Sequence, residues 1–342
     1  MPHQPGEAMS HLPAPLTRAV DAALEATVVL SFSKVGHAVR SRLDSWTPLE
    51  ELPAEGKRVL VTGANSGLGY ATARSLLAAG AGVLISVRSE QNAQNTRRHL
   101  EADLGRDLGE VLETDLLELG DLTQVRAFAE RRLSEAAPLD AVVHNAGALF
   151  ADRVMTVDGL EQTYQVHVVA PFLLTTLLLP KLAATAPSRV VTVTSGGMYT
   201  EKLVTARVDS PGGYRGTVAY ARAKRAQVVL TREWARRFGH TGVAFHVVHP
   251  GWALTPGVES SLPGFRKLTG PILRDPDEGA DTIVYLTLSE EPDEIGRLWH
   301  DRRPRSEHRL PWTIAERGES GELWARVCRD AGVEPVVPGV TG

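Results

Sequence analysis

A glycine-rich turn around residue 65 constrains the fold of this chain more than any other stretch. The run from Val59 to Tyr70 reads VLVTGANSGLGY: a short apolar, β-branched segment enters the turn, and an alanine-rich helical pattern over 68–79 leaves it. A strand, a tight turn and a helix in this order present backbone N–H groups and a helix N-terminus to the phosphates of a ligand. The run therefore predicts a phosphate-binding loop at the end of a buried strand.

Each glycine of this loop has a separate expected role. Gly63 allows the sharp turn, Gly67 lets a ligand approach the backbone, and Gly69 lets the helix pack close to the strand. The spacing between the glycines differs from that of the commoner dinucleotide fingerprint. An ordinary tight turn before a helix is the alternative interpretation. The predicted binding loop comprises Gly63, Asn65, Ser66, Gly67, Leu68 and Gly69.

The rest of the chain alternates between strand-like and helical patterns. This alternation predicts an α/β fold, a doubly wound Rossmann-type parallel sheet of about seven strands with helices on both faces. We expect an edge strand over 295–300. The other strand-like runs cover 58–62, 83–87, 110–114, 140–144, 189–195 and 243–249, and the helical runs cover 67–79, 91–104, 121–136, 157–183, 218–238 and 276–290.

The chain of 342 residues is longer than one such sheet requires. We therefore expect an N-terminal helical extension over 1–50, a catalytic domain over 51–310 and a C-terminal helical tail over 311–342. Residues 53–56 read PAEG and are the expected linker before the first strand.

Composition narrows the class of protein. A hydrophobic content of 43% allows a full core, and a net charge of −4 with interspersed charges gives no basic field for nucleic acid. The single Cys328 excludes an internal disulfide and a thiol metal cluster. The first 16 residues lack a basic region followed by an apolar core, so we expect no secretory signal and a cytoplasmic location.

The N-terminal extension holds an apolar stretch with two interpretations. Ala22 to Phe32 spans 11 residues and contains Glu25, whereas crossing a bilayer requires about 20 residues. The stretch continues into the basic residues Lys34 and Arg40 with one apolar side. Either the helix docks on the catalytic domain, or residues 15–43 make peripheral contact with a membrane surface.

Ser195 and the pair Tyr220 and Lys224 carry the chemistry. A tyrosine four residues before a lysine places both side chains on one face of a helix. A nearby ammonium favours the phenolate and lowers the pKa of the tyrosine. A tyrosine that titrates closer to neutral pH can act as the acid and base of carbonyl–alcohol interconversion.

Four further motifs complete a pattern that resembles the short-chain dehydrogenase/reductase family from about Lys57 to about Arg302. The motif His144-Asn145-Ala146-Gly147 resembles the family's Asn-Asn-Ala-Gly element, with histidine in place of the first asparagine. The match of all these motifs together is highly specific. The four are Asp115-Leu116, His144-Asn145-Ala146-Gly147, Ser195 after the strand at 190–194, and Pro250-Gly251-Trp252-Ala253-Leu254-Thr255.

The resemblance implies an oxidoreductase that transfers hydride between a nicotinamide cofactor and an apolar carbonyl or alcohol. It implies that Ser195, Tyr220, Lys224 and the residue at the position of His167 are catalytic. It also implies that Tyr220 and Lys224 contact the cofactor, with Lys224 lowering the pKa of Tyr220. The other implied cofactor contacts are the glycine loop, Asp115, Leu116, Asn145, Ala146, Gly147, Pro250, Gly251 and Thr255.

The runs at 195–198, 249–252, 262–265, 278–282 and 300–302 narrow the resemblance to the subgroup that includes retinol dehydrogenases.

The cofactor follows from the residues after the second strand, which read Ile85-Ser86-Val87-Arg88-Ser89. A carboxylate there would hold the ribose 2′-hydroxyl of NAD(H). The stretch has none, and Arg88 can bind a 2′-phosphate. We therefore predict NADP(H) over NAD(H), with an exposed loop arginine as the alternative.

His167 departs from the family pattern, which has asparagine at this position. Pro171 lies four residues later and has no N–H, so the carbonyl of His167 lacks its helical donor. On one interpretation this carbonyl binds the water that relays protons in the family, and the side chain is secondary. On the other, the loss of asparagine weakens the relay.

Several features stay open at this stage. The irregular stretch 262–274 is either a substrate lid or a surface connection. His300 and Asp301 belong to a solvated, salt-bridged tail rather than a metal site, because adjacent residues of an extended segment point to opposite sides. A homodimer or homotetramer is an expected assembly. Two other functions compete: a weakly active or inactive NADP(H)-binding regulatory protein, and a membrane-surface lipid or retinoid reductase.

Overall fold

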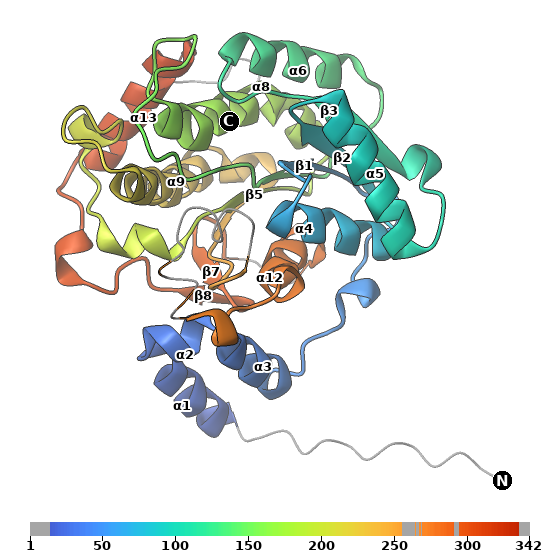
Figure 1. The fold of residues 1–342 in the computed structure, drawn as a ribbon, viewed down its shortest axis with the longest axis horizontal. Coiled ribbons are helices and arrows are strands. Elements are labelled where there is room, and N and C mark those ends of the chain that lie inside the picture. Colours follow the sequence, from blue (N-terminus) through green and yellow to red (C-terminus); the bar gives the residue numbers. More distant parts are fainter. Residues whose placement is uncertain (1–13, 255–263, 265–266, 268, 291–293, 335–342) are drawn as a thin grey trace.

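The computed structural model describes residues 14–254, 264, 267, 269–290 and 294–334 (Figure 1). Eight strands form one sheet in the order β3-β2-β1-β4-β5-β6-β7-β8, one strand more than expected. Strands β1 to β7 are parallel, and β8 pairs antiparallel with β7. The strands are β1 Arg58–Thr62, β2 Gly82–Val87, β3 Leu112–Leu116, β4 Ala141–His144, β5 Ser188–Val193, β6 Val243–Val248, β7 Leu298–His300 and β8 Arg303–Arg305.

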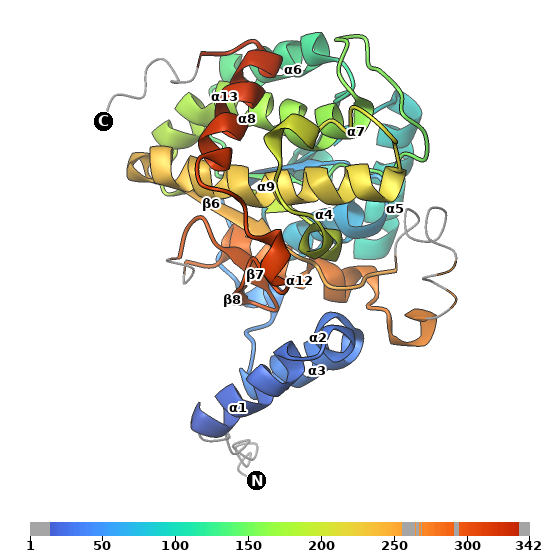
Figure 2. The same ribbon diagram turned by 90° about the vertical axis from the view of Figure 1, so that its left-hand side faces the viewer.

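Helices cover both faces of this sheet, as the alternating pattern predicts (Figures 1 and 2). One face carries α4 (Gly67–Ala78), α5 (Glu90–Leu104) and α12 (Pro276–Leu288). The other carries α6 (Leu122–Ser134), α8 (Ala170–Ala184), α9 (Gly216–Phe238) and the C-terminal helix α13 (Glu319–Ala331). Short helical turns lie at Leu49–Glu51 (η1), Gly109–Val111 (η2), Gly196–Thr200 (η4), Thr205–Arg207 (η5), Gly239–Thr241 (η6), Gly270–Ile272 (η7) and Pro311–Thr313 (η8).

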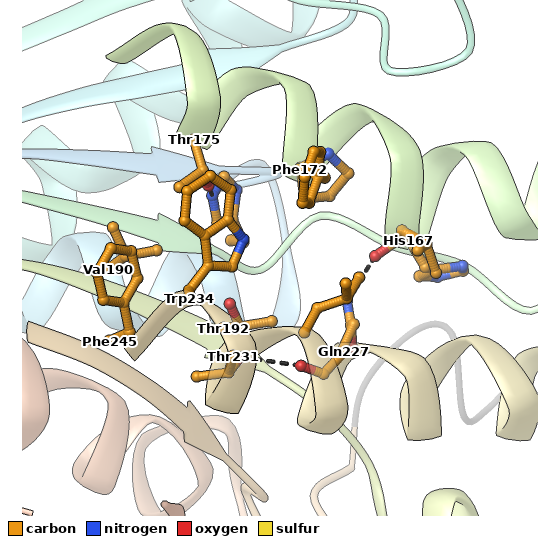
Figure 3. Close-up of a pocket in the computed structure, with 13 residues that line it drawn as sticks. His167, Phe172, Thr175, Val190, Thr192, Gln227, Thr231, Trp234 and Phe245 are labelled. Carbon is orange, nitrogen blue, oxygen red and sulfur yellow. Dashed lines mark hydrogen bonds between the residues drawn. The ribbon is translucent and has the colours of Figure 1, made fainter. Parts of the chain in front are cut away.

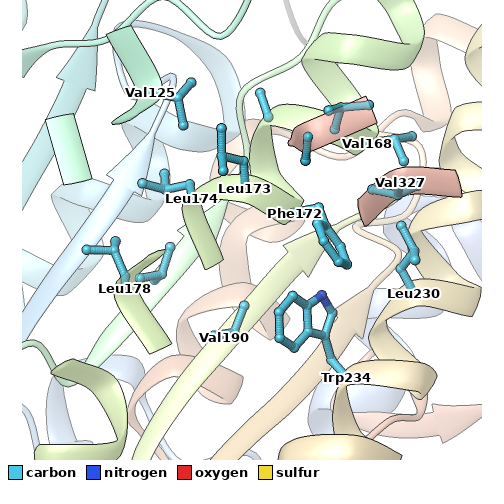
Figure 4. Packing of buried hydrophobic residues seen from close by; sticks show 14 of the residues in the cluster. Val125, Val168, Phe172, Leu173, Leu174, Leu178, Val190, Leu230, Trp234 and Val327 are labelled. Carbon is cyan, nitrogen blue, oxygen red and sulfur yellow. The ribbon is translucent and has the colours of Figure 1, made fainter. Parts of the chain in front are cut away.

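The apolar helical run Gln162–Ala184 belongs to the core of the molecule. By length and composition it could cross a membrane, but 78% of its most apolar window is buried inside the protein. Phe172 of this run packs against Trp234 of α9, with ring centroids 5.0 Å apart (Figure 4). It also packs against Trp324 of α13, with ring centroids 4.9 Å apart. The C-terminal helix therefore completes the same core as α8 and α9.

The run 157–183, expected as one helix, consists of three pieces. It begins as α7 (Gln162–Tyr164), passes through the π-helical turn η3 (Gln165–Val169) and continues as α8. The N–H of Ala170 bonds to the carbonyl of Gln165, five residues earlier. Because Pro171 has no N–H, the ordinary four-residue ladder cannot continue through this point, and the wider turn absorbs the defect.

Residues of the N-terminal extension form three helices, α1 (Ala14–Glu25), α2 (Val28–Phe32) and α3 (Lys34–Leu43), beside β7 and β8 (Figures 1 and 2). In the structure, these helices dock on the catalytic domain. The Arg40 side chain is 1% exposed and donates to Asp21 and to Asp301, the latter 261 residues away in sequence.

The expectation of a solvated tail around His300 is wrong. His300 and Asp301 are almost fully buried, with His300 Nε2 3.5 Å from Asp301 Oδ2. They share one side because Asp301 and Arg302 have left-handed backbone (φ +51° each) in the turn between β7 and β8, not extended backbone. No group of three or more His, Cys, Asp or Glu side chains that could hold a metal ion occurs in the part of the chain that the structure describes.

Candidate active site

The carboxyl ends of β1, β4, β5 and β6 carry the predicted site segments. Because these strands are parallel neighbours, the segments that follow them meet at one edge of the sheet. From β1 the strands follow one another toward one edge of the sheet as far as β3, and β4 then starts on the other side of β1. Ligands of open α/β sheets bind where the strand order reverses in this way. The glycine loop and the Ser195 region therefore lie at the same edge of the sheet.

The glycine loop between β1 and α4 has the predicted conformation. Gly63 and Gly67 have positive φ angles of +66° and +55°. A Cβ atom on Gly69 would collide with the carbonyl of Gly63 and with Asn145, so only glycine permits this close approach of helix and loop. Ser66 begins α4 without capping the helix through its side chain. The cradle and the helix N-terminus fit the diphosphate of a dinucleotide.

The Asn145 side chain fixes the start of the glycine loop through hydrogen bonds to the loop backbone. Its Nδ2 donates to the carbonyls of Thr62 and Gly63, at 3.0 and 3.1 Å. The Thr62 hydroxyl in turn accepts the N–H groups of Asn145 and Ala146. The segment after β4 is thus tied to the segment after β1.

Three predicted cofactor contacts lie at the carboxyl ends of β2 and β3. Arg88 directly follows β2 and is exposed. Asp115 and Leu116 are the last residues of β3 rather than residues after it. The Asp115 carboxylate pairs with Arg131 and Arg132, at 3.1 and 3.3 Å, so its charge is already balanced within the protein.

Ser195, Tyr220 and Lys224 come together at the end of β5. Ser195 precedes η4, and its hydroxyl bonds to the side chain of Tyr220 on α9. Lys224 Nζ lies over the Tyr220 ring, 5.4 Å from its centroid, and donates to the carbonyl of Val193 at 2.9 Å. The next residue of the strand edge, Thr194, donates to the backbone carbonyl of Lys224.

Burial controls the titration of this group. It lowers the pKa of Lys224 to about 7 and raises the pKa of Tyr220, which the hydrogen bond from Ser195 partly offsets. The expected lowering of the Tyr220 pKa by Lys224 is not found, because the ammonium lies over the ring and bonds to Val193 instead of facing the hydroxyl.

The backbone carbonyl of His167 accepts a hydrogen bond from Gln227 Nε2 at 2.9 Å (Figure 3). Gln227 thus supplies one donor to this carbonyl, whose second lone pair can still accept from a water, so the relay interpretation stays a prediction. Gln227 lies three residues after Lys224, on the same face of α9. This carbonyl faces a small buried cavity, whose lining includes Phe172, Thr175, Thr192, Gln227, Thr231 and Trp234.

The ring of His167 points away from this cavity and supports the site (Figure 3). It meets the Tyr220 ring edge-on at 5.3 Å. Burial, aided by the charge of Lys224, lowers the pKa of His167 to about 3, so the ring is neutral. Nδ1 therefore donates to the Thr163 carbonyl at 2.9 Å, and Nε2 accepts the N–H of Ala148 at 3.2 Å. The side chain is not secondary: it fixes the loop after β4.

The Pro250-Gly251 segment follows β6 and is held by Arg274. Gly251 has φ +79°, and a Cβ atom there would collide with the Arg274 guanidinium. Arg274 N donates to the Trp252 carbonyl, and Leu254 N donates to the Arg274 carbonyl. The predicted contact Thr255 lies outside the described residues, as do residues 262, 263, 265, 266 and 268 of the predicted lid at 262–274.

Residues 57–264, more than half of the chain, match the short chain dehydrogenase family. The chain belongs to this family. It is therefore an oxidoreductase that interconverts alcohols and carbonyls with a nicotinamide cofactor, as the sequence pattern predicts. The matched region includes every predicted site residue.

Relatives of this chain lie within the predicted subgroup. It is 37% identical to human dehydrogenase/reductase SDR family member 12 over 80% of this chain and 84% of the relative. It is 36% identical to human retinol dehydrogenase 14, over 79% and 84%. A crystal structure of an uncharacterized protein from Mycobacterium paratuberculosis has a TM-score of 0.67 at 27% identity, covering 85% of this chain and 99% of that one.

Three residues that the family motifs do not include also build the site: Phe32, Gln227 and Arg274. Gln227 could have been found from its helical spacing to Lys224, which places both on one face. No sequence pattern indicated a role for Arg274, other than its place before Asp275, the N-cap residue of α12. None indicated a role for Phe32, because its contacts are all with residues far away in sequence.

Proposed function

We propose that this short-chain dehydrogenase uses NADP(H) to interconvert an apolar carbonyl compound and its alcohol, with Tyr220 as the general acid and base. The juxtaposition of Ser195, Tyr220 and Lys224 beside the glycine loop carries this proposal. The bound nicotinamide supplies or accepts the hydride. We also propose a cytoplasmic location and a homodimeric or homotetrameric assembly.

Each residue of the group has one step in the reduction direction. The Tyr220 hydroxyl donates its proton to the carbonyl oxygen as negative charge develops there. Ser195 donates a hydrogen bond to the same oxygen and stabilises that charge. Lys224 places a cationic group beside the phenolate that forms, with Nζ 5.4 Å from the ring centroid, and solvent replaces the proton that Tyr220 has lost. His167 acts only as a positioning residue, through the Tyr220 ring and Ala148.

The preference for NADP(H) rests on Arg88. It is exposed at the end of β2, and no hydrogen bond or ion pair to the side chains of the described residues engages its guanidinium. The neighbouring Ser89 caps α5, so its hydroxyl is used within the protein. A free guanidinium in this place can bind a phosphate in a bidentate manner.

The decisive experiment measures NADPH oxidation with a panel of apolar aldehydes and ketones. We expect Tyr220→Phe to lower kcat by at least about 100-fold while the Kd for NADPH stays the same. Tyr285→Phe on α12 is the matched control and should keep wild-type activity. NADPH binding without turnover of any compound would instead favour the regulatory protein.

The cofactor preference is tested with Arg88→Ala in the same assay. We expect kcat/KM for NADPH to fall about tenfold or more, since a charge-assisted hydrogen bond is lost, and kcat/KM for NADH to stay unchanged. Arg98→Ala, an exposed arginine on α5, is the control. An unchanged preference in Arg88→Ala would refute the assignment.

A membrane-surface lipid or retinoid reductase is the second candidate function. One observation favours it: five apolar side chains of the N-terminal helices are 39–49% exposed. The relative named retinol dehydrogenase 14 acts, by its name, on an apolar alcohol. The exposed residues are Leu16, Val28, Val29, Leu30 and Val35, which we call the N-terminal apolar patch.

A further inference from the structure

The end of α2 and the residue that joins it to α3, Ser31–Ser33, are bonded to the Pro250-Gly251 segment, and we call these three residues the Ser31–Ser33 turn. The N–H of Trp252 donates to the carbonyl of Phe32 at 2.7 Å. Arg274 donates through Nε to the Ser33 carbonyl at 3.2 Å and through Nη2 to the Ser31 carbonyl at 3.1 Å. Its Nη1 lies 3.4 Å from the Pro250 carbonyl. The extension thus shapes the backbone that follows β6.

The Phe32 ring fills the space between the segments that follow β5 and β6. It is 2% exposed and meets His249 edge-on, with ring centroids 4.3 Å apart. It stacks on Tyr199 of η4 at 5.9 Å and meets Trp252 edge-on at 5.9 Å. A Cβ atom on Gly196, the residue after Ser195, would lie 3.6 Å from the ring. Removing the ring would leave both segments without their shared packing partner.

A buried ionic cluster fixes this turn to the sheet. Asp301 accepts from Arg274 at 2.6 and 2.9 Å and from Arg40 of α3 at 2.7 Å. Arg40 also donates to the Ser31 carbonyl and hydroxyl, at 3.2 and 3.1 Å. All three charged side chains are at most 1% exposed. Charges this deeply buried keep one geometry, because an unpaired one would be costly.

The position of these segments determines which half of a dinucleotide they border. The diphosphate belongs at the N-terminus of α4, at the centre of the sheet. Hydride transfer must occur beside Ser195 and Tyr220, which lie at β5 and α9. The nicotinamide half therefore extends toward β5 and β6, and the adenosine half toward β2 and β3.

We propose that the Ser31–Ser33 turn is a structural part of the nicotinamide side of the active site, with Phe32 as a positioning residue for the segments after β5 and β6. The inference rests on the proposed function for the identity of the ligand. It assigns the N-terminal extension a role in the reaction itself, in addition to any contact that its outer surface makes.

Binding of a whole and a half cofactor tests this proposal. Phe32→Ala should raise the Kd for NADPH about tenfold or more and leave the Kd for adenosine 2′,5′-bisphosphate, which has only the adenosine half, unchanged. Phe32→Leu, which keeps most of the packing volume, should restore NADPH binding to within about threefold of wild type. Val29→Ala, an exposed residue of the same helix, is the control. An equal loss for both ligands, or no loss, would overturn the proposal.

Hydrogen exchange on the cofactor-free protein separates this proposal from the proposed function. Phe32→Ala, or Phe32→Val if the alanine variant does not fold, should speed exchange at 196–200 and 250–254 but not at the glycine loop 62–70, whereas Phe32→Leu should exchange almost like the wild type. If the wild-type protein binds NADH instead of NADPH, the pair of ligands becomes NADH and adenosine 5′-monophosphate. If it binds neither, the proposed function fails, and unchanged exchange at these two segments would overturn the positioning role as well.

Discussion

At the scale of single residues, His167 changes most between the sequence and the structure. Its place in the family pattern raised the question of a weakened proton relay. The structure gives the ring two hydrogen bonds and an edge-on contact with Tyr220, and it places Gly147 where only glycine fits beside the ring. His167 thus places an imidazole ring where the family has the smaller amide of asparagine, and Gly147 leaves room for that ring.

We therefore expect His167→Asn to lower kcat rather than raise it. Asparagine is too short to keep both the Thr163 and Ala148 contacts, so one buried group loses its partner, at about 1–3 kcal/mol of unfolding free energy. Turnover with NADPH and urea unfolding measure the two effects. His240→Asn, at an exposed position, is the control. A rise in kcat of about tenfold would instead show that the wild-type relay is weakened.

At the scale of elements, the N-terminal helices have two different faces. The inner face carries Phe32 and Arg40, both almost fully buried against the sheet and its C-terminal turn. The outer face carries the N-terminal apolar patch. A patch of this kind on an otherwise polar surface marks a binding surface, and a membrane would cover it without disturbing the inner contacts.

Vesicle binding tests the outer face. We expect the wild-type protein to sediment with phosphatidylcholine vesicles containing anionic lipid, and Val29→Asp to reduce the bound fraction severalfold, because a charge opposes insertion of the patch. Val157→Asp, an exposed valine far from the patch in sequence, should bind like the wild type. Complete recovery of the wild-type protein in the supernatant would rule out the membrane-surface reductase.

At the scale of the whole molecule, five histidines lie buried in the neutral form. Burial lowers the pKa of His144 to about 4, and those of His167, His246 and His300 to about 3; the pKa of His249 also lies well below its ordinary value. Their unfolded pKa is about 6.5. Below that pH the unfolded chain binds protons that the folded protein does not.

Stability should therefore be fully present above pH 6.5 and fall as the pH is lowered, by up to about 1.4 kcal/mol per pH unit for each histidine. Urea unfolding between pH 7.5 and 5 measures the slope. His246→Leu should make the slope of stability against pH smaller by the contribution of one histidine. It should also stabilise the protein at pH 5, since neither ring nitrogen of His246 has a hydrogen-bond partner among the described residues. His99→Gln, at an exposed position, should leave the slope unchanged. A flat profile would contradict the neutral, buried state.

The sequence by itself determined the family, the parallel doubly wound sheet and the glycine loop. These depend on local patterns: strand and helix periodicity, glycines that the backbone requires, and motifs whose residues are close together in sequence. Even the pairing of Tyr220 with Lys224 is a helical spacing. The place of Ser195 in the same site was implied by the family resemblance, because the serine follows the strand at 190–194.

Only the tertiary structure decided the environment of these residues. The buried state of His300 and Asp301 required two arginines from distant segments, one of them in the N-terminal extension. The pKa shifts of Tyr220 and Lys224 follow from burial and, for Tyr220, also from the hydrogen bond of Ser195. The bond from Gln227 to His167 joins residues 60 positions apart. Burial and long-range pairing depend on which elements pack together, and no local pattern in the chain specifies that.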